Sequence, residues 1–335
     1  MLPAYAELHC LSNFSFLRGA SHPEELIERA HALGYAAIAI TDECSLSGVV
    51  RAHLAAKACG LKLIIGSEFT LADGVKLVLL ATDRASYGNL SQLITRGRRQ
   101  AKKGTYALSR DDVVAFADGL LALWVPPANP PSPEAGPTSD ATASCNRGPG
   151  FCRRSTRATS SPVFATACWV ATAFPGRAWI TVELTVHAGD RTRLAQLAAL
   201  SQASGLPPAA AGDVHMHARS RRALQDTLTA IRLRIPLAGC GYALYPNGER
   251  YLRSRARLAT IYPPELLTET VAIAERCTIS LDELRYEYPE EIVPPGETPT
   301  SHLRKLVEAG LVRRYGKVGS DSTFRQTQRP EEGLH

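Results

Sequence analysis

The sequence lacks the cysteine spacings that define a disulfide scaffold or a zinc finger. Its 335 residues include eight cysteines, which are scattered along the chain without a Cys-x-x-Cys pair. A disulfide framework would be shorter and denser in cysteine. We therefore expect reduced thiols and a cytoplasmic location.

Long apolar runs are also missing. No apolar segment reaches the roughly 18 residues that a membrane-spanning helix needs, and the first seven residues do not combine a basic region with an apolar stretch. Secretion, membrane insertion and a membrane partner are therefore not expected.

A strong charge of either sign is absent as well. The 38 Lys and Arg residues outnumber the 32 Asp and Glu residues, which gives a net charge of +6. This mild excess is compatible with a nucleic-acid partner but does not require one. Hydrophobic residues make up 45% of the chain, enough for a buried core. The length indicates one large domain or two smaller ones.

Short apolar runs alternate with segments of helical periodicity. This alternation favours parallel strands with helices packed outside them. A helix is expected over residues 21–33, and Ser21 and Glu24 at its start have capping-box spacing. Further strands are expected at 36–40, 62–65, 75–81 and 177–186, and further helices at 46–59, 86–99, 191–204, 221–233 and 264–277.

Three acidic residues follow three of the apolar runs. Asp42 comes after Ile40, Glu68 after Ile65, and Asp213 after the 209–211 run. Parallel sheets collect functional side chains at the carboxyl ends of their strands. The pattern predicts a convergent acidic site, although each residue could instead cap the helix that follows it.

Two basic stretches, 96–103 and 249–257, are candidates for phosphate contact. A solvated charged face is the simpler interpretation of such runs, so the signal is weak. The candidate contacts are Arg96, Arg99, Lys102, Lys103, Arg253 and Arg255.

Two segments break the periodic pattern. Residues 126–162 are rich in Pro, Ser, Thr, Gly and Arg, and we expect an irregular, disordered insertion there. A disturbance of the reading frame that begins near Ala128 and recovers before Phe174 is the alternative to a true insertion. Residues 316–335 are polar and aperiodic, and we expect a disordered tail.

The segment from Tyr5 to Gly19, the helix after it and the Thr41-Asp42-Glu43 strand end resemble the opening of a PHP (polymerase and histidinol phosphatase) domain. More specifically, the sequence resembles the N-terminal domain of bacterial C-family DNA polymerases, and within them the error-prone branch. It runs from about residue 5 to 125 and from 173 to 315. The resemblance implies an α/β, barrel-like PHP domain with parallel strands and outer helices over residues 5–245. It also implies a helical link over 246–315 towards a polymerase palm that this chain lacks.

The resemblance places His9, Asp42, Glu68, Asp213 and His215 in the ligand positions of the PHP metal site. Four other positions depart from that pattern. Leu11, Glu43 and Arg98 stand where histidines are expected, and the strand end at Trp124-Val125 lacks an expected cysteine. Leucine cannot bind a metal, and arginine stays protonated. We therefore expect a vestigial site without a bound cofactor.

Arg98 offers a physical substitute for the lost ion. Several carboxylates close together are costly unless cations or protons compensate them, and a guanidinium can bridge two carboxylates. Arg98 is therefore a candidate counter-ion for the acidic cluster. Membership of the solvated basic run is the alternative.

The similarity implies the N-terminal part of an error-prone DNA-directed DNA polymerase, a nucleotidyltransferase of damage-tolerant (translesion) synthesis and DNA repair, encoded here in truncated or disrupted form. The full enzyme would use Mg²⁺ and DNA and contact its own core or accessory translesion proteins. No Asp-x-Asp pair or Gly-rich nucleotide loop occurs in this chain, so no catalytic residue is expected and the fragment alone should be inactive. The alternatives are a free-standing PHP phosphoesterase and a non-catalytic scaffold.

Overall fold

A computed structural model describes residues 2–127, 161–284 and 293–315. The chain divides into two compact units, Met1–Leu284 and Arg285–His335. Most of the predicted irregular insertion and the whole predicted tail lie outside the described residues.

The first unit is built on seven strands that follow one another across the sheet in chain order. All neighbouring strands are parallel except that β4 is antiparallel to both β3 and β5. The prediction of purely parallel strands was therefore wrong at β4, because the five residues between β3 and β4 are too few for a parallel crossover. The strands are β1 (Ala6–Glu7), β2 (Ala37–Ile40), β3 (Lys62–Thr70), β4 (Lys76–Ala81), β5 (Leu120–Val125), β6 (Ala178–Glu183) and β7 (Pro208–Ala211).

Main-chain contacts between the two edges nearly close this mixed sheet into a barrel. The Leu11 amide donates to the Val214 carbonyl over 2.8 Å, and the Val214 amide donates to the His9 carbonyl over 2.9 Å. The buried Glu7 carboxylate accepts from the Gly212 amide over 2.9 Å. A Cβ atom on Gly212 would lie 2.3 Å from the Glu7 carboxylate, so this seam needs a glycine. The barrel-like α/β fold class is thereby confirmed.

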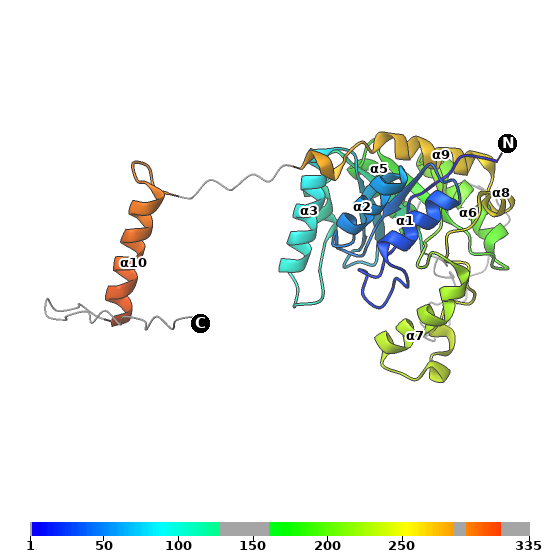
Figure 1. Cartoon of the computed structure of the whole chain (residues 1–335). Helices are drawn as coiled ribbons and strands as arrows, with labels where there is room; N and C mark the ends of the chain where they lie inside the picture. The colour runs from blue at the N-terminus through cyan, green and yellow to red at the C-terminus, as the bar shows by residue number, and fades with distance from the viewer. Residues whose placement is uncertain (1, 128–160, 285–292, 316–335) are drawn as a thin grey trace, which may run out of the picture. The chain divides into compact units, whose positions relative to one another are not determined.

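The helices of the first unit surround the sheet, and α9 lies across one end (Figure 1). Helices α1, α2, α3, α6, α7 and α9 correspond to the six predicted helices with shifted bounds. The bounds are α1 (Pro23–Ala32), α2 (Val49–Cys59), α3 (Arg84–Arg99), α4 (Arg110–Ala115), α5 (Pro162–Ala173), α6 (Asp190–Ser204), α7 (Arg222–Leu233), α8 (Arg255–Ile261), α9 (Pro264–Arg276) and, in the second unit, α10 (Pro299–Tyr315).

One local expectation was wrong, and one helix was not predicted. The N-cap of α1 is His22, whose amide donates to Glu25, so the expected Ser21 and Glu24 capping box is shifted by one residue. Ser21 instead bonds to His217. Helix α5, which the sequence did not predict, begins at Pro162, the last residue of the segment expected to be irregular, and buries Ala167 and Val170 against the core.

The barrel interior is a separate apolar cluster whose members alternate along the strands. It contains Ile64 on β3 and Trp179 on β6, and the α9 residues Ile273 and Ala274 close it from one end. Side chains two residues apart share a face of a strand. The inward face therefore continues from Ile64 through Gly66 to Glu68, and from Trp179 through Thr181 to Glu183. The fold thus directs carboxylates to the barrel end opposite α9.

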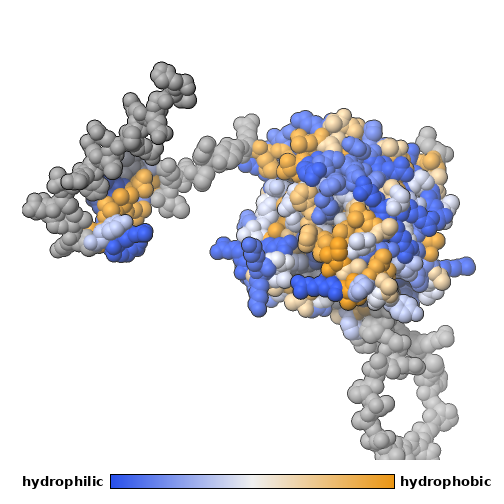
Figure 2. Space-filling model, turned by 60° about the horizontal axis from the view of Figure 1, so that its bottom comes forward, coloured by the Kyte–Doolittle hydropathy of each residue, from blue (hydrophilic) through white to orange (hydrophobic). Residues whose placement is uncertain are grey.

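On the face of the first unit shown in Figure 2, hydrophilic residues surround several smaller hydrophobic areas. None of the helices in the described part of the chain combines the length and the apolar composition that crossing a lipid bilayer requires.

Candidate functional site

The carboxyl ends of four strands or strand extensions meet at the barrel end opposite α9. His9 follows β1, Glu68 lies near the end of β3, Glu183 ends β6, and Asp213 follows β7. The ligand atoms of His9, Glu68 and Asp213 lie within 4.8 Å of one another and all three residues are buried, a spacing compatible with one metal ion.

Carboxylates contact His9 on both sides. Its Nδ1 atom lies 2.8 Å from Glu183 Oε1, and its Nε2 atom lies 2.7 Å from Glu68 Oε2. Burial alone would lower the pKa of His9, but the hydrogen bonds to Glu183 and Glu68 outweigh it and raise the pKa. Both nitrogens lie within hydrogen-bond distance of carboxylate oxygens, an arrangement that favours the imidazolium form.

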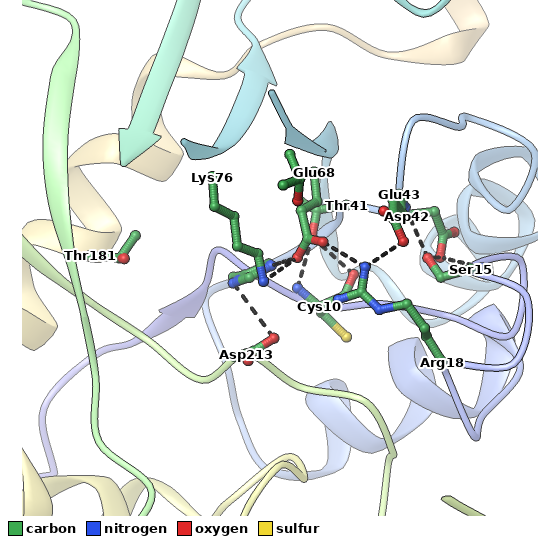
Figure 3. A network of polar contacts seen from close by, with 12 residues as sticks. Cys10, Ser15, Arg18, Thr41, Asp42, Glu43, Glu68, Lys76, Thr181 and Asp213 are labelled. Carbon is green, nitrogen blue, oxygen red and sulfur yellow. Dashed lines mark hydrogen bonds and ion pairs between the residues drawn. The ribbon is translucent and has the colours of Figure 1, made fainter. Parts of the chain in front are cut away.

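Three basic side chains contact the fully buried Glu68, and two of them, Arg18 and Lys76, are labelled in Figure 3. Besides His9, Lys76 Nζ lies 2.8 Å from Oε2, and an Arg18 guanidinium nitrogen lies 2.6 Å from Oε1. Burial would raise the pKa of Glu68, but Lys76, His9 and Arg18 together hold it well below its ordinary value. Both carboxylate oxygens are therefore occupied by positive groups.

Arg18 connects two of the acids. It lies in the loop between β1 and α1, and the same guanidinium nitrogen also lies 2.5 Å from Glu43 Oε2. Tyr106 donates to the other Glu43 oxygen over 3.0 Å. Gln225 on α7 donates to the Arg18 carbonyl over 2.8 Å, which anchors the loop. The Arg18 side chain is thus fixed between Glu43 and Glu68.

Asp213 has its own partners. Its backbone φ angle is +42°, in the left-handed region that non-glycine residues seldom adopt. Its Oδ1 atom lies 3.0 Å from His215 Nε2, and Oδ2 forms an ion pair with Arg250. Arg250 also stacks 4.2 Å above the Tyr245 ring. These contacts hold Asp213 in its strained conformation.

His215 is the uncharged histidine of the site. Burial, with the nearby Arg18 and Lys76 charges, lowers its pKa well below the ordinary value. Its Nε2–H therefore donates to Asp213, while Nδ1 is buried without a hydrogen-bond partner.

Asp42 follows a strand end, as predicted, but its carboxylate binds a loop and is not part of the acidic cluster. Its carboxylate accepts the amides and the hydroxyls of Ser12 and Ser15, at distances from 2.7 to 3.1 Å. Burial raises the Asp42 pKa, although the serine hydrogen bonds oppose the shift. Asp42 therefore fixes the loop after β1 and does not point into the His9 cluster (Figure 3).

The structure corrects the role expected of Arg98. Its guanidinium donates to the backbone carbonyls of Cys44 and Glu43, over 3.0 to 3.3 Å, and lies over the Tyr106 ring. The side chains that neutralise the carboxylates are Arg18, Lys76 and Arg250 instead.

The structure also corrects one predicted nucleic-acid contact. Arg253 is only 1% exposed, and it donates to the Leu184 carbonyl inside the protein. Arg96 forms an ion pair with Asp112, and Arg255 is partly buried beside Gly34. The remaining candidates, Arg99, Lys102 and Lys103, are exposed.

Sequence reasoning missed Arg18, Lys76, Glu183 and Arg250. Glu183 carried a usable signal, because it ends an apolar strand just as Glu68 does. Lys76 and Arg18 carried none, because a single basic residue at the start of a strand or in a loop is common.

A cavity of about 550 Å³ opens beside Glu183 and Arg250. It lies between the ends of β5 and β6 and the first turn of α6, and Arg193 and Thr192 also line it. Arg193 donates to the Pro126 carbonyl over 2.7 Å. The acidic cluster is therefore reachable from solvent on the Glu183 side.

The residues do not fit a complete PHP metal centre. Leu11 is fully buried in a position where the family pattern has a ligand. Both oxygens of Glu68 already contact basic side chains, and the two oxygens of Asp213 contact the His215 N–H group and the Arg250 guanidinium. A metal ion could bind here only by displacing these groups.

Comparison with known proteins gives the family. Residues 7–135 match the PHP domain model. The chain is 54% identical to the error-prone DNA polymerase of Dechloromonas aromatica, in an alignment that covers 99% of this chain and 30% of that protein. The corresponding polymerase of Methylococcus capsulatus is 52% identical over 97% of this chain and 28% of its own length. That of Pseudomonas aeruginosa is 49% identical over 99% and 29%.

Among solved structures, an amidohydrolase from Chromobacterium violaceum is 18% identical, with a TM-score of 0.41 over 63% of this chain and 88% of that one. This likeness is too loose to bear on function. The polymerase relatives are much longer than this chain, which spans about 30% of their length. The chain contains a PHP domain and is homologous to the N-terminal part of bacterial error-prone DNA polymerases.

Proposed function

We propose that this chain serves as the non-catalytic PHP region of an error-prone DNA polymerase that carries out damage-tolerant DNA synthesis. The observation that carries the proposal is the identity of about half of all aligned residues over nearly the whole chain. In the full enzyme, acids of the palm would hold Mg²⁺ for nucleotidyl transfer. The role proposed for the present region is structural support of that core.

The geometry of the acidic cluster supports a non-catalytic role. A hydrolytic metal centre needs an open coordination position for water. Here Arg18, Lys76 and His9 contact the Glu68 oxygens, and Arg250 contacts Asp213. A free-standing phosphoesterase, the main alternative, would need the ligands that Leu11 and Arg98 replace.

DNA is the proposed partner of the full enzyme, with the core and accessory translesion proteins as further partners, and the proposed location is the cytoplasm. Within this chain, the exposed Arg99, Lys102 and Lys103 are proposed to contact phosphates without reading sequence.

A chimeric polymerase tests the proposal. The matching N-terminal region of the Pseudomonas aeruginosa relative would be replaced by this chain, and primer extension with Mg²⁺ and four nucleotides would be measured. We expect extension by the chimera, little or none by the relative without its N-terminal region, and none by this chain alone. A folded but inactive chimera, or metal-dependent phosphomonoester hydrolysis by this chain alone, would contradict the proposal.

A further inference from the structure

The acidic cluster has counter-ions within the protein itself. Its carboxylates are those of Glu43, Glu68, Glu183 and Asp213. Arg18 contacts Glu43 and Glu68, Lys76 contacts Glu68, and Arg250 contacts Asp213. Side-chain cations therefore lie where a metal ion would otherwise compensate these carboxylates.

Lys76 occupies the central place among these cations. It is the first residue of β4 and pairs with Thr70, while Val78 pairs with Glu68. Lys76 and Val78 lie two residues apart and share a face of the sheet, so the Lys76 side chain reaches Glu68 diagonally across the strands. Its Nζ atom lies 2.8 Å from the Glu68 oxygen that also contacts His9 Nε2.

Glu68 belongs to the one group of residues in the described part of the chain whose ligand atoms have the spacing of a metal site, formed by His9, Glu68 and Asp213. An ammonium ion has no lone pair, so it competes with a metal for the carboxylate and repels it by charge. Lys76 is only 24% exposed in its side chain, so water screens this repulsion weakly.

We propose that Lys76 is the resident cation of this site, which it keeps closed to divalent metal ions, with Arg18 and Arg250 as the outer counter-ions. A carboxylate cluster of this kind is stable only when its charge is compensated. In this chain the compensating positive charges belong to side chains of the protein. The fold of the site is therefore independent of metal supply.

The test compares the unmodified chain with Lys76→Met, which keeps the length of the side chain but removes its charge. Thermal unfolding would be measured in chelator and after addition of ZnCl₂ or MnCl₂ alone, and bound metal would be counted after gel filtration. We expect the unmodified chain to hold far less than one ion per chain and to keep the same Tm under all conditions.

Lys76→Met should have a lower Tm in chelator, because one buried carboxylate charge is then uncompensated. Added Zn²⁺ or Mn²⁺ should raise the Tm, with about one ion retained per chain. Lys103→Met, at an exposed lysine outside the site, is the matched control and should behave like the unmodified chain.

A second variant covers the case in which Lys76→Met fails to fold. Combining it with Glu68→Gln removes the opposite charge as well, so the double variant should fold and unfold at a higher Tm than Lys76→Met alone. Four results would overturn the proposal: metal retained by the unmodified chain, a Tm of Lys76→Met in chelator equal to that of the unmodified chain, a Lys76→Met variant that no ion stabilises, or no recovery in the double variant. The ion pairs do not depend on the role in a polymerase, so this test and the primer-extension test can fail separately.

Discussion

Two arginines at this site differ in what their guanidinium groups contact. Arg18 lies between the carboxylates of Glu43 and Glu68, whereas Arg98 donates to backbone carbonyls. A carbonyl oxygen near the surface that loses its donor can accept a hydrogen bond from water instead. A buried carboxylate such as that of Glu68 cannot. The cost of removing the two side chains should therefore differ.

We expect Arg18→Ala to destabilise the chain clearly and Arg98→Ala to do so only slightly. Removing one partner of a buried pair typically costs about 3 to 5 kcal/mol, and the remaining contacts of Glu68 with His9 and Lys76 should keep the loss below that range. Chemical denaturation at neutral pH would give the free energy of unfolding of both variants.

The opposite order of stabilities would show that Arg98, as the sequence suggested, is the main counter-ion. Arg99→Ala serves as the background for both variants, because Arg99 is exposed.

The sequence predicted the position of the site better than it predicted the contacts of the side chains there. Acids at strand ends predicted the meeting of Glu68 and Asp213, because strand alternation and parallel pairing fix where such side chains point. Asp42 also lies at a strand end, but its carboxylate accepts hydrogen bonds from Ser12 and Ser15 and so does not join the cluster. The counter-ions depended on long side chains that reach across the barrel end, which no local pattern encodes.

The elements of the fold were predictable where one local signal dominated. Apolar runs and helical periodicity gave most strands and helices, since both periods follow from backbone geometry. The direction of β4 was missed because it depends on the length of the connection rather than on the strand itself. Helix α5 was missed because its start lies directly after a segment of irregular composition.

Helix α3 contains two glycines with different surroundings, which gives a matched pair of substitutions. A Cβ atom on Gly88 would meet nothing within 4 Å, whereas one on Gly97 would lie 2.9 Å from Leu108 Cγ. Gly88→Ala should stabilise the chain by about 0.5 to 1 kcal/mol through helix propensity. Gly97→Ala should lose this gain, because overpacking typically costs about 1 to 3 kcal/mol.

Chemical denaturation of both glycine variants would check the difference. Equal stabilisation by the two substitutions would mean that Leu108 does not pack against α3 as described.

The N-terminus of α4 gives a pH-dependent prediction. The Ser109 amide and hydroxyl, with Arg96, lower the Asp112 pKa from 3.8 to about 2. Since the folded-state pKa is the lower one, the Asp112 charge stabilises the fold above pH 3.8, and this contribution is lost as the pH falls towards about 2. Asp112→Asn should therefore lower the Tm near neutral pH, and the difference should shrink in acid.

Thermal unfolding of both proteins across this range would check the effect. A Tm difference that stays constant with pH would show that the Asp112 charge does not support the helix.

For the whole molecule, the net charge of +6 bears on nucleic-acid binding only through the basic residues that face solvent. The side chains of Arg253 and Arg250 make contacts within the protein. Those of Arg99, Lys102 and Lys103 face solvent. Replacing these three exposed residues with alanine should weaken binding of a single-stranded oligonucleotide. The slope of log K against log salt should fall by roughly 2 to 3, at about 0.7 to 0.9 per phosphate contact.

Fluorescence anisotropy at several salt concentrations would measure both effects. The matched control replaces Arg29, Lys62 and Arg191, which are exposed basic residues on other elements. Equal loss of binding by the two triple variants would assign the affinity to net charge and not to the 96–103 stretch.

The central claim is that side-chain cations hold the acidic cluster in place of metal ions. Anomalous X-ray diffraction from crystals of this chain soaked in MnCl₂ or ZnCl₂ tests it most directly. We expect no anomalous peak among His9, Glu68 and Asp213, and Lys76 Nζ within hydrogen-bond distance of Glu68. A peak bonded to these three residues, with Lys76 displaced, would contradict the account.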